Sequence, residues 1–136
     1  MSKDKIKKHL PTAAVLIVGI AGIALMVLSG GNTSGYASGQ LDQFATCLKE
    51  RGAVFYGAFW CQHCQNEKAF FGSSANLLPY VECSAPDGQT QLSVCTAKKV
   101  EGYPTWDFKD GTRLTGEVTL KTLAEKTGCE LPAKAK

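Results

Sequence analysis

Residues 53–64 read AVFYGAFWCQHC, an apolar run followed at once by two cysteines that two residues separate. An uninterrupted apolar run is typical of a central strand that is buried on both faces. If a helix begins at Cys61, its thiol lies where unpaired N–H groups and the helix dipole favour an anion. Cys64 then follows one turn later on the same face, near enough for a short disulfide. The stretch therefore predicts a redox-active cysteine pair at a strand-to-helix junction.

A redox pair of this kind contains an attacking sulfur and a resolving sulfur, because the thiolate is the nucleophile in disulfide exchange. His63 adds a group that can carry positive charge near Cys61 and favour its thiolate. A structural disulfide and half of a zinc site are the alternatives. Zinc needs a second ligand pair, and the other histidine, His9, precedes an apolar segment. Redox chemistry is therefore predicted, with no metal and no cofactor.

The chain has 136 residues and a formal charge of +3, enough length for one domain of ordinary size. The basic excess comes from residues 1–9, and from residue 11 onward eleven Lys and Arg balance eleven Asp and Glu. A near-neutral domain removes the usual electrostatic argument for nucleic-acid binding. Six cysteines in so short a chain favour an oxidising compartment, since a cytosolic protein would keep them reduced.

The N-terminal part predicts export. Residues 1–9 form a basic tail expected in the cytoplasm, and residues 10–29 contain enough apolar sequence for a single transmembrane signal anchor. A cleaved signal peptide is the alternative. The membrane is expected to be a plasma or thylakoid-type membrane, with the C-terminal domain on its extracytoplasmic or periplasmic side. Residues 30–39 have the composition of a flexible linker, residues 40–130 form the domain, and residues 131–136 form a C-terminal tail.

Within the domain, periodicity and turn residues predict alternating helices and strands followed by an antiparallel hairpin, hence a mixed central sheet with helices on both faces. The α/β order places helices at 41–50, 61–72, 89–100 and 119–126, and strands at 53–59, 80–83, 104–108 and 113–115.

These residues resemble the thioredoxin superfamily over about residues 41–129. FWCQHC at 59–64 matches the active-site motif of that superfamily, and GYPT at 102–105 matches its cis-proline segment. FYGAFWC at 55–61, YVEC at 80–83 and GYPTW at 102–106 are closer still to one branch. That branch is the thioredoxin-like domain associated with bacterial homologues of vitamin K epoxide reductase.

The resemblance implies thiol–disulfide exchange with protein substrates, in which Cys61 attacks and Cys64 resolves. It also implies a cis peptide bond before Pro104, packed against the active-site pair, and backbone pairing of the Tyr103 region with an extended substrate segment. Trp60, Tyr103 and Thr105 are then the expected substrate-binding residues.

Two positions depart from the family pattern. Many thioredoxins carry a buried acid six positions before the first active-site cysteine, and this chain has Phe55 there. Glu67 is the nearest substitute, but we expect it on a solvated helix face. Gln62 stands where the branch often has proline, and the residues between the cysteines help to set the reduction potential.

The remaining four cysteines allow three pairings. Cys83 and Cys95 are close enough in sequence for a local disulfide, and the family branch carries a pair at this place. Cys47 and Cys129 could then join the two ends of the domain, although a buried free thiol at Cys47 is the alternative.

The sequence thus predicts a membrane-anchored thiol–disulfide oxidoreductase that acts on exported cysteine-containing proteins. Histidine between the cysteines favours a disulfide donor or isomerase, because stabilising the Cys61 thiolate stabilises the dithiol. The expected membrane partner is a quinone-linked oxidase resembling vitamin K epoxide reductase. An extracytoplasmic reductase fed by a transmembrane electron carrier and a non-catalytic thioredoxin-fold binding module are the alternatives.

Overall fold

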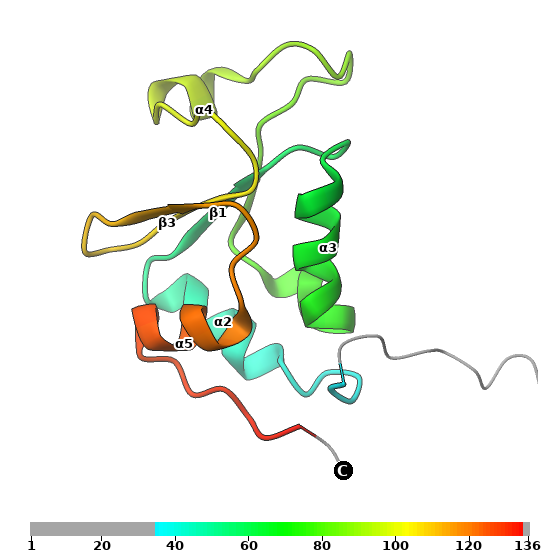
Figure 1. Ribbon diagram of the computed structural model, residues 1–136, viewed down its shortest axis with the longest axis vertical. Helices are drawn as coiled ribbons and strands as arrows, with labels where there is room; N and C mark the ends of the chain where they lie inside the picture. The colour runs from blue at the N-terminus through cyan, green and yellow to red at the C-terminus, as the bar shows by residue number, and fades with distance from the viewer. Residues whose placement is uncertain (1–34, 135–136) are drawn as a thin grey trace, which may run out of the picture. The chain divides into compact units, whose positions relative to one another are not determined.

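The computed structural model describes residues 35–134, in which helices and strands alternate before a terminal hairpin and helix (Figure 1). The helices and strands are α2 (Asp42–Glu50), β1 (Val54–Gly57), α3 (Gln62–Phe71), the short 3-10 helix η1 (Gly72–Leu77), β2 (Tyr80–Glu82), α4 (Ser93–Ala97), β3 (Thr105–Asp107), β4 (Arg113–Thr115) and α5 (Leu120–Thr127).

The four strands form one mixed sheet in the order β2-β1-β3-β4. β1 pairs in parallel with β2, and α3 with η1 supplies the crossover that parallel neighbours require. β3 is antiparallel to both β1 and β4. The mixed sheet predicted from the order of elements is confirmed, and the architecture fits a thioredoxin-like fold.

Alternate residues of the sheet face two separate cores. Phe55 and Trp106 are directly paired across β1 and β3, both fully buried, and their rings stack with centroids 4.8 Å apart. They pack in the main core with apolar residues of α2, α3 and α5. Tyr56 faces the other way and joins a smaller core with Cys83 and Cys95. Figure 1 shows the result, with α4 on one side of β1 and β3 and with α2 and α5 on the other.

The predicted helix at 89–100 is wrong in extent, since only Ser93–Ala97 is helical. Asp87 provides the physical reason, because its carboxylate accepts hydrogen bonds from the backbone N–H groups of Gln89 and Thr90. Such side-chain-to-backbone bonds hold a turn and compete with a helix. Ser84 and Gln91 then form an isolated antiparallel bridge, so the chain between them is a loop.

The segment before α2 lies partly against the domain. Tyr36 belongs to the main core at 6% exposure, and the Gly39 N–H donates to Ser73 Oγ. The end of the predicted linker at 30–39 is therefore packed in the structure. The predicted basic tail and the predicted anchor at 10–29 lie outside the described residues. Within residues 35–134 no helix is long and apolar enough to cross a membrane.

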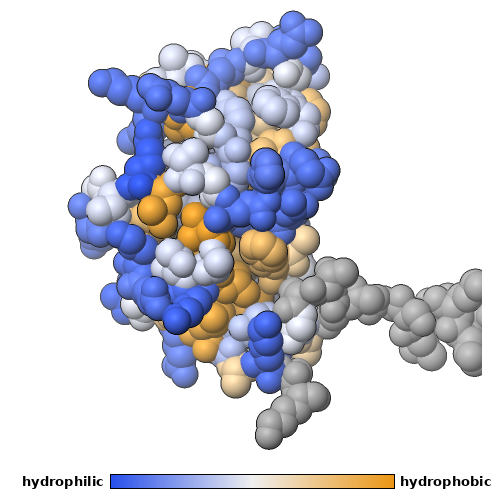
Figure 2. Space-filling view, in the orientation of Figure 1, coloured by the Kyte–Doolittle hydropathy of each residue, from blue (hydrophilic) through white to orange (hydrophobic). Residues whose placement is uncertain are grey.

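One face of the domain combines hydrophobic and hydrophilic side chains. Figure 2 shows hydrophobic residues gathered in the middle and lower part of this face, with hydrophilic residues around them. A groove of the described domain is lined in part by Tyr36, Phe70, Leu120 and Leu131. The C-terminal residues contribute to it, because Leu131 packs against the main core.

Candidate active site

Cys61 occupies the N-cap position of α3, directly after the buried strand β1. Its backbone is extended, and its Sγ accepts a hydrogen bond from the Cys64 N–H at 3.2 Å. A sulfur thus takes the place that Ser, Thr, Asp or Asn oxygens usually fill at a helix start. Backbone N–H groups and the positive end of the helix dipole favour an anion at this sulfur.

Cys64 lies deeper than Cys61, with 1% of its surface exposed against 6%. Burial raises the pKa of the Cys64 thiol well above its ordinary value, and the hydrogen-bonded Cys61 sulfur raises it further. Among the described cysteines these two carry free thiols. The geometry therefore gives one sulfur that an outside group can approach and a second sulfur held behind it.

Gly57 makes room for the buried sulfur. A Cβ on this residue would lie 2.7 Å from Cε2 of Tyr80 and 3.1 Å from Sγ of Cys64. Only glycine lets the strand approach this closely, which is one reason for a glycine inside a buried strand. Gly57 was not predicted as a site residue from the sequence. A glycine in the middle of an apolar run does indicate a place where another group approaches the strand closely.

His63 is exposed and held by an acid from another part of the chain. Its Nδ1 lies 2.7 Å from Oε1 of Glu117, and Asn66 Nδ2 donates to the same oxygen at 3.0 Å. The hydrogen bond from His63 holds the pKa of the Glu117 carboxyl below its usual value, followed in effect by the bond from Asn66. Glu117 was missed from the sequence, because it lies 54 residues from His63.

The cis-proline segment lies beside the cysteine motif. The Tyr103–Pro104 peptide bond is cis, and Pro104 is buried. The Tyr103 ring meets the Trp60 ring edge to face, with centroids 6.0 Å apart. Trp60 is 52% exposed and Phe59 is 50% exposed, so the residues that precede Cys61 present aromatic surface to an approaching protein.

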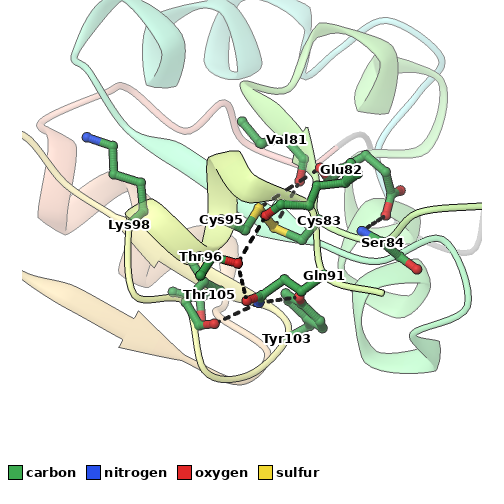
Figure 3. Close-up of a disulfide and its surroundings, with 12 residues drawn as sticks. Val81, Glu82, Cys83, Ser84, Gln91, Cys95, Thr96, Lys98, Tyr103 and Thr105 are labelled. Carbon is green, nitrogen blue, oxygen red and sulfur yellow. Dashed lines mark hydrogen bonds between the residues drawn. A yellow bond between two sulfur atoms is a disulfide. The ribbon is translucent and has the colours of Figure 1, made fainter. Parts of the chain in front are cut away.

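Two residues of the loop between Cys83 and Cys95 hold these aromatics in place. Ser84 Oγ accepts from Trp60 Nε1 at 2.9 Å, and Gln91 Nε2 donates to the Tyr103 hydroxyl at 2.7 Å. Figure 3 shows Gln91 between Tyr103 and Thr96, next to the Cys83–Cys95 disulfide. Ser84 and Gln91 were not predicted as site residues, because nothing in the local pattern shows which way this loop folds.

Thr105 differs from its expected role. Its side chain is 1% exposed, and its hydroxyl donates to the Gly102 carbonyl at 2.8 Å. The hydroxyl therefore supports the turn before β3.

Glu67 is also placed differently from the expectation of a solvated helix face. The side chain is fully buried, and Oε1 accepts hydrogen bonds from Trp106 Nε1 at 2.6 Å and from the Val118 N–H at 3.2 Å. The covering groups come from β3 and from the segment before α5, which the periodicity of α3 alone does not reveal.

The other four cysteines are paired in the structure. Cys47 is bonded to Cys129, with Cα atoms 5.9 Å apart, and Cys83 is bonded to Cys95, with Cα atoms 5.6 Å apart. Both separations lie in the usual disulfide range. Over residues 35–134, no group of three or more His, Cys, Asp or Glu side chains is arranged to hold a metal ion.

Comparison with known proteins shows similarity to a plant oxidoreductase. No family model matches the chain. The chain is 46% identical over 89 residues to the protein named Thiol-disulfide oxidoreductase LTO1 of Arabidopsis thaliana. The match covers 62% of this chain and 23% of the plant protein, so the chain spans about a quarter of that relative's length. The mixed α/β structure fits a thioredoxin-like fold, and over the matched residues the chain is similar to a protein named for thiol–disulfide oxidoreductase chemistry.

Proposed function

We propose that the chain is a protein thiol–disulfide oxidoreductase that donates disulfides to exported proteins through Cys61 and Cys64. The observation that carries this proposal is the position of Cys61. Its sulfur caps α3 and accepts the Cys64 N–H, with the more deeply buried Cys64 one turn behind it.

The donating reaction begins with a disulfide between Cys61 and Cys64. A substrate thiolate attacks Sγ of Cys61, the bond between the two cysteines breaks, and Cys64 leaves with the electron pair. A second substrate thiolate then attacks the substrate sulfur of the mixed disulfide and displaces Cys61. The chain ends as a dithiol and the substrate gains a disulfide. The helix start and His63 favour this outcome because they favour the departing Cys61 thiolate.

Exposed aromatic groups next to Cys61 would bind the substrate. Trp60 and Tyr103 lie in contact, and the backbone around Tyr103 would pair with an extended substrate segment. This mode of binding depends on main-chain hydrogen bonds and tolerates many sequences. It therefore suits an enzyme that acts on several exported proteins.

Membrane attachment and the electron acceptor belong to the same proposal. Residues 10–29 would anchor the chain in a plasma or thylakoid-type membrane, with the domain on the extracytoplasmic side. A quinone-linked partner resembling vitamin K epoxide reductase would reoxidise the Cys61–Cys64 pair. Anchoring in the same membrane raises the effective concentration of the two proteins for each other.

A trapping experiment tests the proposal. A Cys64→Ser chain, expressed in an oxidising cell envelope, is expected to accumulate mixed disulfides on Cys61, because the resolving sulfur is absent. Non-reducing gels and mass spectrometry would detect them. Cys61→Ser is the matched control and is expected to trap nothing, since Cys64 is 1% exposed. If Cys64→Ser captures no protein, the site is not catalytic and the chain is a binding module.

The reduction potential decides the direction of electron flow. We expect the Cys61–Cys64 pair of the full chain to equilibrate at about −180 to −120 mV, the range of isomerases and strong oxidases. Thiol alkylation and mass spectrometry in glutathione buffers would measure it. A value near −270 mV, the potential of thioredoxin, would instead make the chain a reductase.

A His63→Gln variant is expected to lower that potential by about 20 to 30 mV. A positive charge beside the thiolate is worth on the order of 1 kcal/mol in a solvated site, and 30 mV corresponds to about 1.4 kcal/mol for this two-electron couple. The same glutathione titration measures the shift. Gln62→Ala, a change at the neighbouring neutral position, is the control. A potential that stays constant or rises in His63→Gln would contradict a role for His63 in thiolate stabilisation.

A further inference from the structure

Glu67 is a buried acid that the exchange reaction described above does not use. It lies one turn after Cys64 on the same face of α3, and both side chains are at most 1% exposed. Residues three apart on a helix are neighbours, and the Glu67 carboxylate is within electrostatic reach of the Cys64 thiol. The carboxyl group therefore lies on the inner side of the cysteine pair.

The two carboxyl oxygens of Glu67 have different surroundings. Oε1 accepts from the Trp106 indole and from the Val118 N–H, which fix the side chain from two other elements. Oε2 is buried and has no hydrogen-bond partner among the described residues. An unpaired buried oxygen costs free energy, and a proton on Oε2 would lower that cost. One oxygen thus holds the group, and the other is available to a proton.

The reaction needs a proton at this place. When a substrate attacks Cys61, Cys64 departs as a thiolate inside the domain, and burial disfavours that charge. In the reverse direction the Cys64 thiol must lose its proton before it can attack. Solvent has little access to Cys64, because only 1% of this residue is exposed. A buried proton donor and acceptor next to Cys64 would serve both directions.

We propose that Glu67 is the proton-transfer group of Cys64, an inference that rests on the proposed exchange function. In disulfide donation, the substrate thiolate bonds to Sγ of Cys61 and the Cys61–Cys64 bond breaks. The Cys64 sulfur takes the electron pair and then the proton from Oε2, which leaves Glu67 as a carboxylate. In the opposite direction Glu67 accepts the Cys64 proton, and the thiolate displaces the substrate sulfur from Cys61. Such a transfer, made directly or through one water molecule, is the step that a general acid or base supplies.

The protonation equilibrium of Glu67 suits this role. Burial raises the pKa of Glu67 to about 7, and the hydrogen bonds from Trp106 and Val118 oppose this rise without cancelling it. Both forms are therefore populated near neutral pH, where a general acid–base group is most effective. The charged and titratable groups that face it are the Cys64 thiol of its own helix and Glu117 of the segment before α5, whose carboxylate raises the pKa further. From β2, Tyr80 lies against the same cysteine pair.

A Glu67→Gln variant of the full chain separates proton transfer from a purely structural role. Glutamine keeps an oxygen that can accept from Trp106 and Val118, but it cannot give or take the proton. The measurement is the stopped-flow rate of reduction of the Cys61–Cys64 disulfide by a dithiol peptide between pH 5 and 9. Each rate is divided by the thiolate concentration of the peptide, so that the remaining pH dependence belongs to the chain.

We expect the normalised rate of the natural sequence to be level below pH 7 and to fall above it, as Glu67 loses its proton. Glu67→Gln is expected to lose this break and to react at least tenfold more slowly below pH 7, since general acids typically contribute about 10²-fold or more. Glu125→Gln is the matched control, because it makes the same change at an exposed acid of α5 and is expected to keep the break.

The outcomes separate the two proposals. If the natural sequence exchanges with the peptide and Glu67→Gln shows the same rate and the same break, Glu67 is structural and the inference is wrong. If the peptide does not reduce the Cys61–Cys64 disulfide of the natural sequence, the proposed function itself fails. Should Glu67→Gln not fold, infrared titration of the natural sequence still decides. It is expected to show a protonated carboxyl band at pH 6 that disappears by pH 8, and its absence at pH 6 would overturn the inference.

Discussion

A Cys47→Ser, Cys129→Ser double variant is expected to lose about 4.5 kcal/mol of unfolding free energy, because this disulfide closes the longer loop of the domain. The two cysteines are 82 residues apart in sequence. In the chain-entropy description, the stabilisation grows with the number of residues that the bond encloses. Domains of this size have about 5–15 kcal/mol in total, so the loss would remove a large fraction of the stability.

The second disulfide is the control for this prediction. Cys83 and Cys95 are 12 residues apart, so their double serine variant is expected to lose about 3 kcal/mol. Urea denaturation at one pH, with every chain oxidised, would compare the two variants with the natural sequence. A larger loss at Cys83 and Cys95 would show that local packing outweighs loop length in this domain.

The unfolding free energy is expected to fall by about 3 kcal/mol between pH 4.5 and pH 8.5 because of Glu67 alone. Its pKa in the folded chain is about 7, against an ordinary value of 4.5. Between these values the folded chain binds a proton that the unfolded chain has released, so stability falls as pH rises. The stabilising contribution is therefore complete below pH 4.5 and lost above pH 7. A difference of about 2.5 in pKa, at about 1.4 kcal/mol each, gives the expected magnitude.

Comparison with Glu67→Gln isolates this contribution. Both chains carry the same other ionisable groups, so their difference in unfolding free energy cancels the rest of the pH dependence. At pH 4.5 we expect similar stability, and at pH 8.5 we expect Glu67→Gln to be more stable by about 3 kcal/mol. Urea denaturation at several pH values measures the difference. A constant difference across this range would mean that the pKa of Glu67 is the same in the folded and the unfolded chain.

The strand β1 and the start of α3 could be predicted from the sequence, because the signals for them lie within a few residues. The apolar run before Cys61 has the composition of a buried strand, and β1 occupies Val54–Gly57 within it. α5 shows the same agreement, because Thr119 caps its start with a side-chain oxygen and Gly128 ends it in the left-handed conformation. These signals act over a few residues, so they can be read without knowing what packs against them.

The loop at residues 84–92 is a place where the prediction from local sequence was wrong, because this segment is not helical. Periodicity predicted a helix from residue 89, but the Asp87 carboxylate accepts hydrogen bonds from the backbone N–H groups of Gln89 and Thr90 and holds a turn. The loop then places Ser84 and Gln91 against Trp60 and Tyr103. These contacts join positions 24 and 12 residues apart, respectively, and periodicity contains no information at that range.

By itself, the sequence determined the unit of strand, cysteine pair and helix, because capping, helix dipole and apolar patterning are local properties. It left the four remaining cysteines with three pairings, and the fold chose one by bringing α2 beside the end of α5 and α4 beside β2. The tertiary structure also decided whether the Glu67 side chain is buried or exposed. A side chain on α3 is solvated or buried according to what covers it, and Trp106 and Val118 come from parts of the chain 39 and 51 residues away.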